Sequence, residues 1–326
     1  MVEPRMDCVS VSVPARLHLG FLDLNGGLGR KFGSIGLALD RPVTRITMHA
    51  ARRASVSGPD AERAQRYLAK ITDALGLPGD FALEIDAAIP AHSGLGSGPQ
   101  LALAIGAAVR RLNRLPLDVR GDAALFDRGA RSGIGIALFS SGGVVVDGGR
   151  TADGPLPPVI AQQPFPDTWR ILLLSDHEAQ GVHGKRERDA FSTLPPFPAD
   201  DAAQLCRRVL MQALPALAER DIANFGAAIT EIQARLGDHF TPVQGGRYTS
   251  RRVAEAAAFL ESAGAHGCGQ SSWGPAGFAF VETEAEARRL AAVLATKTGF
   301  KAEIARGNNA GAVMEETVAA RAAVRA

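Results

Sequence analysis

Cysteine is scarce in this chain: its 326 residues include three, Cys8, Cys206 and Cys268, which lie far apart and form no CxxC pair. Zinc knuckles and disulfide frameworks need paired cysteines, so the sequence indicates neither. Aromatic residues make up only 6% of the chain, and the formal net charge is +2. A nucleic-acid-binding surface needs a basic excess and, for single strands, aromatic stacking platforms. We therefore expect no nucleic-acid partner.

Long apolar runs are also absent. No stretch is long enough to cross a bilayer, and the first residues, MVEPRMDCVSVSV, lack the apolar core of a signal peptide. We therefore expect no membrane partner and a cytoplasmic location. A hydrophobic content of 46% is ordinary for a globular protein, and 326 residues are comfortable for two domains.

Strand and helix patterns follow one another in mixed order along the chain. A stretch rich in glycine and proline, Gly148–Pro166, predicts a boundary between an N-terminal half at 1–165 and a C-terminal half at 166–326. The mixed order predicts an α+β fold with mixed or antiparallel sheets and packed helices, not a doubly wound parallel sheet. The predicted strands are 9–13, 16–24, 34–39, 43–50, 81–89, two within 129–147, 169–174, 278–281, 301–305 and 311–314; the predicted helices are 61–75, 101–112, 200–219, 221–236, 250–263 and 284–296.

The stretch Pro90–Gln100 contains three glycines and two serines and runs directly into an apolar helix pattern. Such a segment can curl so that several N–H groups converge in front of a helix N-terminus, which is a binding site for phosphate oxygens. Its glycine spacing fits neither the dinucleotide fingerprint nor the Walker loop. We therefore expect a phosphorylated small molecule, with these candidate contacts: Ser93, Gly94, Leu95, Gly96, Ser97 and Gly98.

Charged residues beside flexible backbone form two further candidate groups near the N-terminus. Arg16 and His18 share one face of a predicted strand, so they line either a polar cleft or a solvent-facing edge. Asp23 and Arg30 bracket a glycine-rich loop. A carboxylate can hold Mg²⁺ and a guanidinium can clamp an anion, although solvated loop ends are the plainer interpretation.

Two more polar segments follow in the middle of the chain. Arg128 and Arg131 stand beside three glycines in Arg128–Ile136, which indicates either a second anion clamp or exposed surface. His177–Glu187 gathers titratable groups, which fit acid–base chemistry or simply a flexible, charged loop.

The run Gly269–Pro275 reads Gly-Gln-Ser-Ser-Trp-Gly-Pro. A tryptophan between glycines can pack flat against an aromatic substrate, and its neighbours offer neutral hydrogen-bond donors. The alternative is a structural tryptophan at a domain junction. The candidate binding residues are Gln270, Ser271, Ser272 and Trp273.

Three of these segments, in this order, resemble the GHMP superfamily of galactose, homoserine, mevalonate and phosphomevalonate kinases. They are the strand Pro14–Gly20, the loop Pro90–Gln100 and the glycine-rich run Gly267–Gly277. Kinases of this superfamily carry a serine where Gly98 stands. The segments Ala15–Leu24, His92–Gly98, Arg131–Ile136, Gly181–Glu187 and Gly269–Pro275 resemble a GHMP-related family of methanopterin biosynthesis, the β-ribofuranosylaminobenzene 5′-phosphate synthases.

This resemblance implies a two-domain GHMP fold and a condensation of phosphoribosyl pyrophosphate with 4-aminobenzoate or 4-hydroxybenzoate, which releases CO₂ and pyrophosphate. It implies Mg²⁺ and no organic cofactor. The alternatives are an ATP-dependent small-molecule kinase and a non-catalytic module that binds a phosphorylated metabolite. A homodimer is the default expectation for its assembly.

The resemblance also implies residue roles. The loop amides, with Ser93 and Ser97 as added donors, hold the phosphates. Asp23 binds Mg²⁺ or stabilises the oxocarbenium, and Arg30 binds the benzoate carboxylate or a phosphate. Arg16 and Arg131 add positive charge. Trp273 forms one aromatic wall.

These roles predict that Arg30→Ala abolishes turnover while leaving the fold intact. The measurement is ¹⁴CO₂ release from carboxyl-labelled 4-aminobenzoate, with circular dichroism as the check on folding. Near-normal release by the variant would remove Arg30 from the site.

Overall fold

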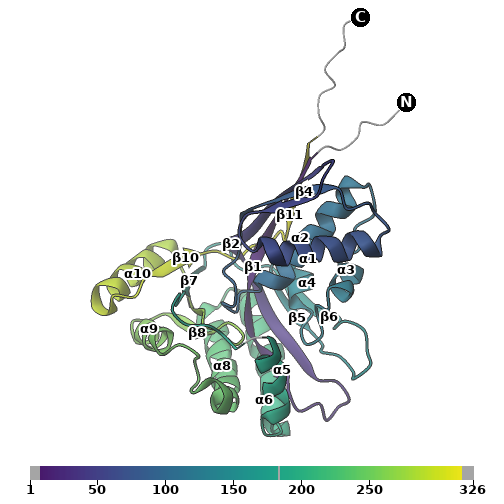
Figure 1. Cartoon of the computed structure of the whole chain (residues 1–326). Helices are drawn as coiled ribbons and strands as arrows, with labels where there is room; N and C mark the ends of the chain where they lie inside the picture. The colour runs from purple at the N-terminus through teal and green to yellow at the C-terminus, as the bar shows by residue number, and fades with distance from the viewer. Residues whose placement is uncertain (1–7, 183, 318–326) are drawn as a thin grey trace, which may run out of the picture.

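The computed structural model describes residues 8–182 and 184–317, which form two neighbouring β-sheets covered by helices (Figure 1). Within these residues the larger sheet has seven strands and the smaller has four. Most strand pairs are antiparallel, and β3 pairs with β4 in parallel. The predicted α+β class with mixed sheets is therefore confirmed.

A long antiparallel hairpin, β1 with β2, is the centre of the larger sheet, and the remaining strands flank it. In β1 a register shift between Pro14 and Arg16 moves the inward residues from one core to another. Val13 packs in the core under α1 and α2, whereas Leu17 packs in the core it shares with α8. The strands are β1 (Cys8–Asp23), β2 (Phe32–Ala50), β3 (Ser55–Ser57), β4 (Phe81–Ala87), β5 (Val144–Asp147), β6 (Val159–Gln163) and β11 (Val313–Thr317).

Four helices belong to this first part of the fold. They are α1 (Ala61–Ala74), α2 (Ser97–Leu112), α3 (Val119–Leu125) and α4 (Ile134–Ser141). Along α2 the apolar residues are buried from Leu101 to Val109, because the helix lies between the sheet and its helical neighbours. This burial fixes the N-terminus of α2 in place.

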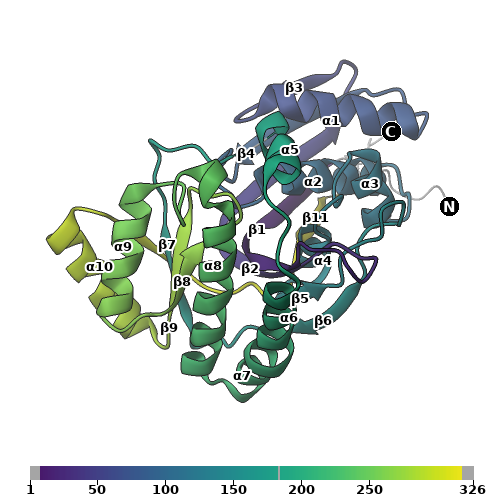
Figure 2. The ribbon, with the colours of Figure 1, turned by 90° about the horizontal axis from the view of Figure 1, so that it is seen from below.

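The smaller sheet is covered on both faces (Figure 2). Alternate residues of β7 separate the two cores: Leu172 packs with α9 and α10, and Leu173 packs with α8. The strands are β7 (Arg170–Leu174), β8 (His266–Gln270), β9 (Gly277–Val281) and β10 (Ala302–Ala305). The helices are α5 (Gly184–Thr193), α6 (Ala199–Arg208), the π-helical turn η1 (Val209–Ala213), α7 (Leu214–Glu219), α8 (Ile222–Gln244), α9 (Arg251–Ser262) and α10 (Glu284–Thr298).

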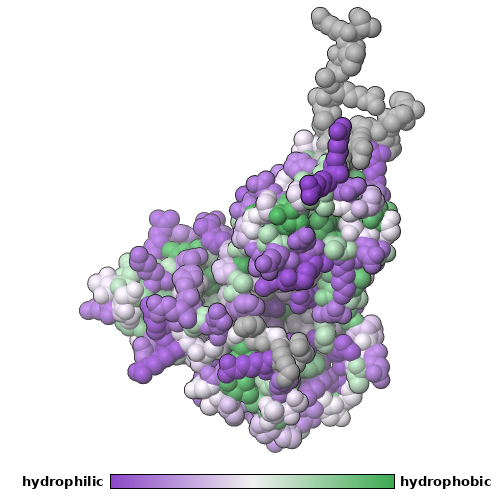
Figure 3. Space-filling view, in the orientation of Figure 1, coloured by the Kyte–Doolittle hydropathy of each residue, from purple (hydrophilic) through white to green (hydrophobic). Residues whose placement is uncertain are grey.

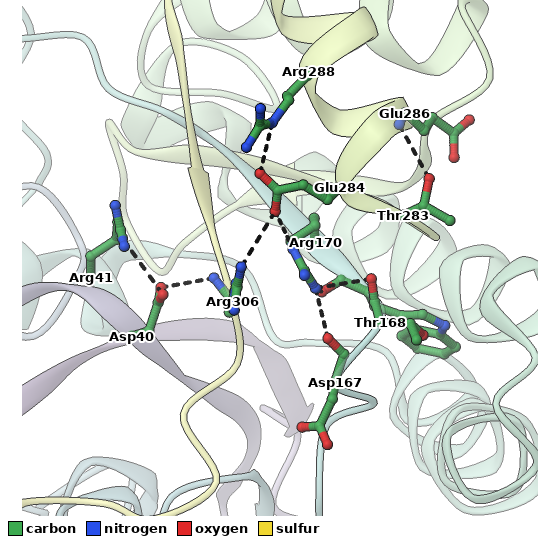
Figure 4. A network of polar contacts seen from close by, with 11 residues as sticks. Asp40, Arg41, Asp167, Thr168, Arg170, Thr283, Glu284, Glu286, Arg288 and Arg306 are labelled. Atoms are coloured by element: carbon green, nitrogen blue, oxygen red, sulfur yellow. Dashed lines mark hydrogen bonds and ion pairs between the residues drawn. The ribbon is translucent and has the colours of Figure 1, made fainter.

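A polar network joins the two sheets away from the site described below (Figure 4). Glu284 accepts a hydrogen bond from Arg170 at 2.6 Å and one from Arg288 at 3.0 Å, and it lies 3.8 Å from Arg306. The backbone N–H of Arg306 donates to Asp40, at the middle of β2, at 2.8 Å. The network therefore ties β7 and α10 of the smaller sheet to the larger one.

Some predictions of local structure are wrong. Residues 134–141, predicted as a strand, form α4, because an uninterrupted apolar run does not distinguish a buried strand from a buried helix. The Asp147 carboxylate accepts from the Gly133 N–H at 2.9 Å and so favours the start of that helix. Part of the polar stretch 177–187 belongs to α5, and β8 lies where only a turn was predicted.

The predicted boundary at 165/166 separates β6 from β7, but strand β11 crosses it. Residues 313–317 return to pair with β1 in the larger sheet. None of the helices in the described ranges is long and apolar enough to cross a membrane. Hydrophilic side chains predominate on the face shown in Figure 3, and apolar residues form only small patches there.

Candidate active site

The predicted phosphate loop lies between β4 and α2. Gly96 has a left-handed backbone, with φ of 85°, directly before Ser97, the first residue of α2. The N–H groups of Ser97 and Gly98 lie in the first turn, where a helix supplies no backbone acceptor, and the described residues supply none either. Both residues line an open cavity of about 430 Å³. The predicted helix N-terminus, with free N–H groups, therefore faces a cavity.

Segments from both halves of the chain line this cavity. The larger sheet supplies one wall through β1, and the connection between α3 and α4 supplies the next. The turn between β8 and β9 and the start of α5 close the other side. The residues used in the following argument are Arg16, His18, Phe21, Arg63, Gly96, Ser97, Gly98, Asp127, Arg128, Arg131, Glu187, Ser272 and Trp273.

The phosphate end of the cavity carries an excess of positive charge. A Cβ on Gly98 would lie 3.7 Å from the guanidinium nitrogens of both Arg63 and Arg128. The Arg128 side chain donates to the Tyr67 hydroxyl, but its Nε is buried without a partner in the described structure. Arg16 also has a buried Nη1 without such a partner. Burial lowers the pKa of Arg16 to about 10, so its guanidinium stays protonated at neutral pH.

Two carboxylates line the same cavity, and each is ion-paired with a basic side chain. Glu187 contacts Arg131 at 2.7 Å, and Asp127 contacts Lys70 at 2.9 Å. Arg131 also lies over the Phe191 ring, 5.2 Å from its centroid. The arginines outnumber these acids, so the cavity favours an anionic ligand.

The bend in β1 turns Arg16 and His18 toward this cavity, because the register shifts on either side of them re-aim the strand. The backbone N–H of Arg16 donates to the Leu95 carbonyl at 3.0 Å, which joins the strand to the phosphate loop. The cleft interpretation of this strand face is therefore the right one, and the solvent-facing edge is wrong. Leu95 itself is buried and contributes through its backbone.

A single hydroxyl group connects the three segments of the site. Ser271 Oγ accepts from the His18 N–H at 3.0 Å and donates to the Gly94 carbonyl at 2.9 Å. Its side chain is fully buried. The Ala276 N–H donates to the Ser93 carbonyl at 3.0 Å, so the loop and the β8–β9 turn are held at two points. Ser271 therefore positions the site and lies behind the cavity surface.

Two other predicted donors also have structural partners. Gln270 Oε1 accepts from the Thr249 N–H at 2.6 Å, and its amide nitrogen lies 3.2 Å from the Ser272 carbonyl. Ser93 Oγ donates to the Pro90 carbonyl at 2.7 Å. Ser272, with a φ of 55°, lines the cavity. The turn thus offers Ser272 to a ligand while Gln270 and Ser93 hold the local backbone.

Trp273 forms the predicted aromatic wall. Its ring centroid lies 4.3 Å from that of Phe240 and 5.6 Å from that of Phe191, and the side chain is 3% exposed. Phe21 lines the same cavity, with its ring 4.5 Å from that of His18. The tryptophan packs between α5 and α8 and also lines the cavity, and its predicted contact with an aromatic substrate stays a prediction.

Asp23 and Arg30 are not brought to this cavity. Asp23 Oδ1 accepts from the N–H groups of Asn25 and Gly26 at 2.7 and 2.9 Å, in the turn after β1. The Arg30 guanidinium donates to the carbonyls of Gly148 and Gly149, each at 3.0 Å. Neither residue lines the cavity, and the catalytic roles that the resemblance implied for them stay predictions.

A resident Mg²⁺ also stays a prediction. Magnesium is commonly held by one or two carboxylates together with substrate phosphates. The carboxylates that line the cavity, Asp127 and Glu187, are both ion-paired, and Asp23 lies elsewhere. Within the described ranges no group of three or more His, Cys, Asp or Glu side chains is placed to hold a metal. The donor set therefore does not fit a protein-held Mg²⁺, and we derive no step through one.

Phe21, Arg63 and Asp127 line the cavity but were not among the predicted contacts. Arg63 lies on α1 in a segment without a motif, so only the folded chain brings it to the loop. Phe21 lies five residues after Arg16, so strict alternation places it on the other face of the strand, and the register shift between His18 and Gly20 brings it to the cavity. Asp127 lies directly before the predicted arginine segment. In the stretch 177–187, Glu187 lines the cavity, and His183 lies outside the described residues.

The buried hydroxyl of Ser271 generates a stability prediction. Ser271→Ala leaves the His18 N–H and the Gly94 carbonyl without their partner, so the free energy of unfolding falls by about 1–3 kcal/mol. Urea denaturation measures it. Ser262→Ala is the control, because the Ser262 hydroxyl is exposed and bonds only the Phe259 carbonyl of its own helix, at 2.8 Å. Equal losses in the two variants would contradict the role of Ser271.

Comparison with known families agrees with this geometry. The GHMP kinases N-terminal domain matches residues 62–143, and the GHMP kinases C-terminal domain matches residues 213–299. Homoserine kinase from Cytophaga hutchinsonii superimposes with a TM-score of 0.66 at 18% identity, covering 95% of this chain and 98% of its own. Mevalonate diphosphate decarboxylase from Staphylococcus aureus superimposes with a TM-score of 0.66 at 16% identity, covering 95% and 98%. At such identities the likeness shows the fold alone.

Two curated relatives are much more similar in sequence. The β-ribofuranosylphenol 5′-phosphate synthase of Methanothermobacter thermautotrophicus is 33% identical over 82% of this chain and 86% of its own length. The protein of the same name from Archaeoglobus fulgidus is 37% identical over 68% and 74%. The family predicted from the motifs is therefore confirmed, with phenol in place of aminobenzene in the relatives' names. This chain belongs to the β-ribofuranosylphenol 5′-phosphate synthase family, on the GHMP kinase fold.

Proposed function

We propose that this protein condenses phosphoribosyl pyrophosphate with a 4-substituted benzoate, with loss of CO₂ and pyrophosphate, to give a C-riboside 5′-phosphate. One observation carries the proposal: a single cavity joins a cationic helix N-terminus to an aromatic wall. The helix N-terminus with its neighbouring arginines suits a phosphorylated sugar, and the aromatic wall suits a benzene ring. The names of the relatives favour this synthase over the ATP-dependent kinase.

The phosphate end supplies donors that are already in place. The N–H groups of Ser97 and Gly98 lie at the positive end of the α2 dipole. Arg63 and Arg128 flank them, and Arg16 contacts the loop from β1. Because the loop is held by the fold before any ligand binds, these groups need little reorganisation when negative charge develops on the departing pyrophosphate.

The ring end supplies shape and apolar contact. A benzoate ring can lie against Trp273 and Phe21, in the offset or edge-on arrangements that aromatic pairs favour. Arg131 lies over the ring of Phe191, which packs against Trp273, so a basic side chain stands beside the aromatic wall. Arg131 is also ion-paired with Glu187. The aromatic wall orients the benzoate ring relative to the ribose, and a reaction between two bound substrates depends mainly on such relative orientation.

The bond changes follow from these positions. The C1–O bond of the ribosyl pyrophosphate breaks with both electrons leaving on pyrophosphate, which forms an oxocarbenium at C1. The ring carbon that carries the carboxylate attacks C1. The bond to the carboxylate then breaks, its electrons restore the aromatic ring, and CO₂ departs. No proton is transferred in these steps, which is consistent with a cavity whose carboxylates are ion-paired.

The benzoate substrate carries either a hydroxyl or an amino group para to its carboxylate. Both donate electron density to the ring carbon that attacks, so the chemistry accepts either. The relatives are named for a phenol product, which supports 4-hydroxybenzoate as the substrate of this chain.

The direct test incubates the unmodified protein with phosphoribosyl pyrophosphate and carboxyl-labelled 4-hydroxybenzoate or 4-aminobenzoate. We expect ¹⁴CO₂ release that depends on both substrates and equals the pyrophosphate formed. ADP formation from ATP and an added alcohol, without CO₂, would favour the kinase. Calorimetric binding of phosphoribosyl pyrophosphate without turnover would favour the non-catalytic module. Either outcome would overturn the proposal.

Arg128 provides a sharper test of the phosphate end. Arg128→Gln removes a charged donor from the pyrophosphate, which costs about 1.5–3 kcal/mol, so kcat/KM for phosphoribosyl pyrophosphate falls roughly 10- to 100-fold. Steady-state kinetics with the sugar substrate varied measures it. Arg251→Gln is the control, because Arg251 is exposed on α9. An unchanged kcat/KM in Arg128→Gln would remove this arginine from the site.

A further inference from the structure

A second, much smaller cavity adjoins the one that holds the site. Its volume is about 20 Å³, and it shares His18, Phe21, Ser272 and Trp273 with the larger cavity. A volume of this size is enough for a single water molecule or one small polar group. The small cavity therefore extends the ring end of the site by the length of one substituent.

The glutamines around this small cavity already have partners. Gln233 Nε2 donates to the Leu19 carbonyl at 2.7 Å, and Gln233 Oε1 accepts from the Gln270 N–H at 2.8 Å. Gln270 Oε1 accepts from the Thr249 N–H. Gln244 Nε2 donates to the Arg247 carbonyl at 3.0 Å. These hydrogen bonds hold the glutamine side chains in the cavity walls, so the glutamines need no hydrogen bond from a ligand.

Two residues that line the small cavity each carry one buried atom without a partner in the described structure: His18 Nε2 and Trp273 Nε1. Each side chain is 3% exposed, so bulk water does not satisfy them. Buried polar groups in native proteins are nearly always hydrogen-bonded. Two residues of one small cavity with unpartnered buried atoms therefore mark a candidate position for a polar group of a ligand.

The two atoms differ in what they can do. The Trp273 indole N–H is a donor only. The neutral His18 ring carries one hydrogen, and in the tautomer with that hydrogen on Nδ1 the unpartnered Nε2 is an acceptor. Burial and the nearby Arg16 lower the pKa of His18 to about 3, which keeps that acceptor free at neutral pH.

A phenol hydroxyl both donates and accepts, so it satisfies both atoms at once. An aromatic amine donates well but accepts poorly, because its lone pair is delocalised into the ring. We infer that His18 Nε2 and Trp273 Nε1 recognise the para-hydroxyl group of the benzoate substrate and select it over a para-amino group. This inference rests on the proposed function and adds the specificity-determining pair to it.

Ring electronics alone would give the opposite preference. A para-amino group donates more electron density to the attacking carbon than a neutral hydroxyl does, so an indifferent pocket favours 4-aminobenzoate. A preference for 4-hydroxybenzoate must therefore come from the pocket. The small volume also fits a hydroxyl group better than a methoxy group.

The experiment measures kcat/KM for 4-hydroxybenzoate and 4-aminobenzoate in the wild type, Trp273→Phe and His18→Phe. We expect the wild type to prefer the hydroxyl substrate. Trp273→Phe removes the indole donor and reduces the aromatic wall, so both substrates lose rate, but kcat/KM for the hydroxyl substrate falls about tenfold more than that for the amino substrate. His18→Phe removes the acceptor that both substituents use, so both substrates lose rate. Trp169→Phe, the same change in a buried tryptophan outside both cavities, keeps the wild-type ratio.

The outcomes separate the two claims. Absence of CO₂ release from both substrates in the wild type contradicts the proposed function itself. With turnover present, equal losses for the two substrates in Trp273→Phe mean that the tryptophan acts structurally or through a trapped water, and the pair is not the selector. If circular dichroism shows that a variant does not fold, measurements on the wild type test the inference. Equal kcat/KM for the two substrates would overturn it. Inhibition by 4-methoxybenzoate as strong as that by a benzoate with a small para substituent would also overturn it.

Discussion

The site depends on one buried hydroxyl group. Ser271 Oγ binds the backbone of β1 at His18 and the backbone of the phosphate loop at Gly94, segments that lie 253 and 177 residues away in sequence. Each segment brings a different chemical group: β1 an arginine and an imidazole, the loop its free N–H groups, and the β8–β9 turn an indole. Because no water reaches Ser271, the fold itself must complete these hydrogen bonds. The relative position of phosphate and ring is therefore set before a ligand binds.

The glycines of the loop have different physical roles, although the sequence makes them look equivalent. Gly94 has a φ of 86°, and a Cβ there would lie 2.2 Å from the Ser271 carbonyl, so it permits the backbones to meet. At Gly98 a Cβ would find its neighbours at 3.7 Å, which is ordinary contact. Gly98 instead leaves open space between the helix N-terminus and two guanidinium groups. One glycine thus builds the loop, and the other makes room for its ligand.

The parts of the site that were predicted from sequence are those encoded locally. A glycine-rich loop before an apolar helix and a tryptophan in a glycine-rich turn are each visible within a few consecutive residues, and both line the cavity. Asp23 and Arg30 illustrate the limit. A strand rises about 3.3 Å per residue, so Asp23 lies roughly 16 Å beyond His18 along β1. Closeness of Asp23 to Arg16 in sequence does not reveal how far the long strand β1 extends past the cavity. Arg63 comes from helix α1, which only tertiary packing brings to the cavity.

The two ends of the cavity are electrostatically coupled. Arg16, which contacts the phosphate loop, and Arg131, which also lines the cavity, both lower the pKa of His18, after the larger effect of burial. A bound pyrophosphate would offset the arginine charges and remove part of that effect. Burial would remain, because the imidazole is enclosed by protein whether or not the phosphate end is filled. Burial alone therefore keeps the pKa of His18 lowered when the phosphate end is filled, so a neutral imidazole is present at the stage when the benzoate ring must be oriented for attack.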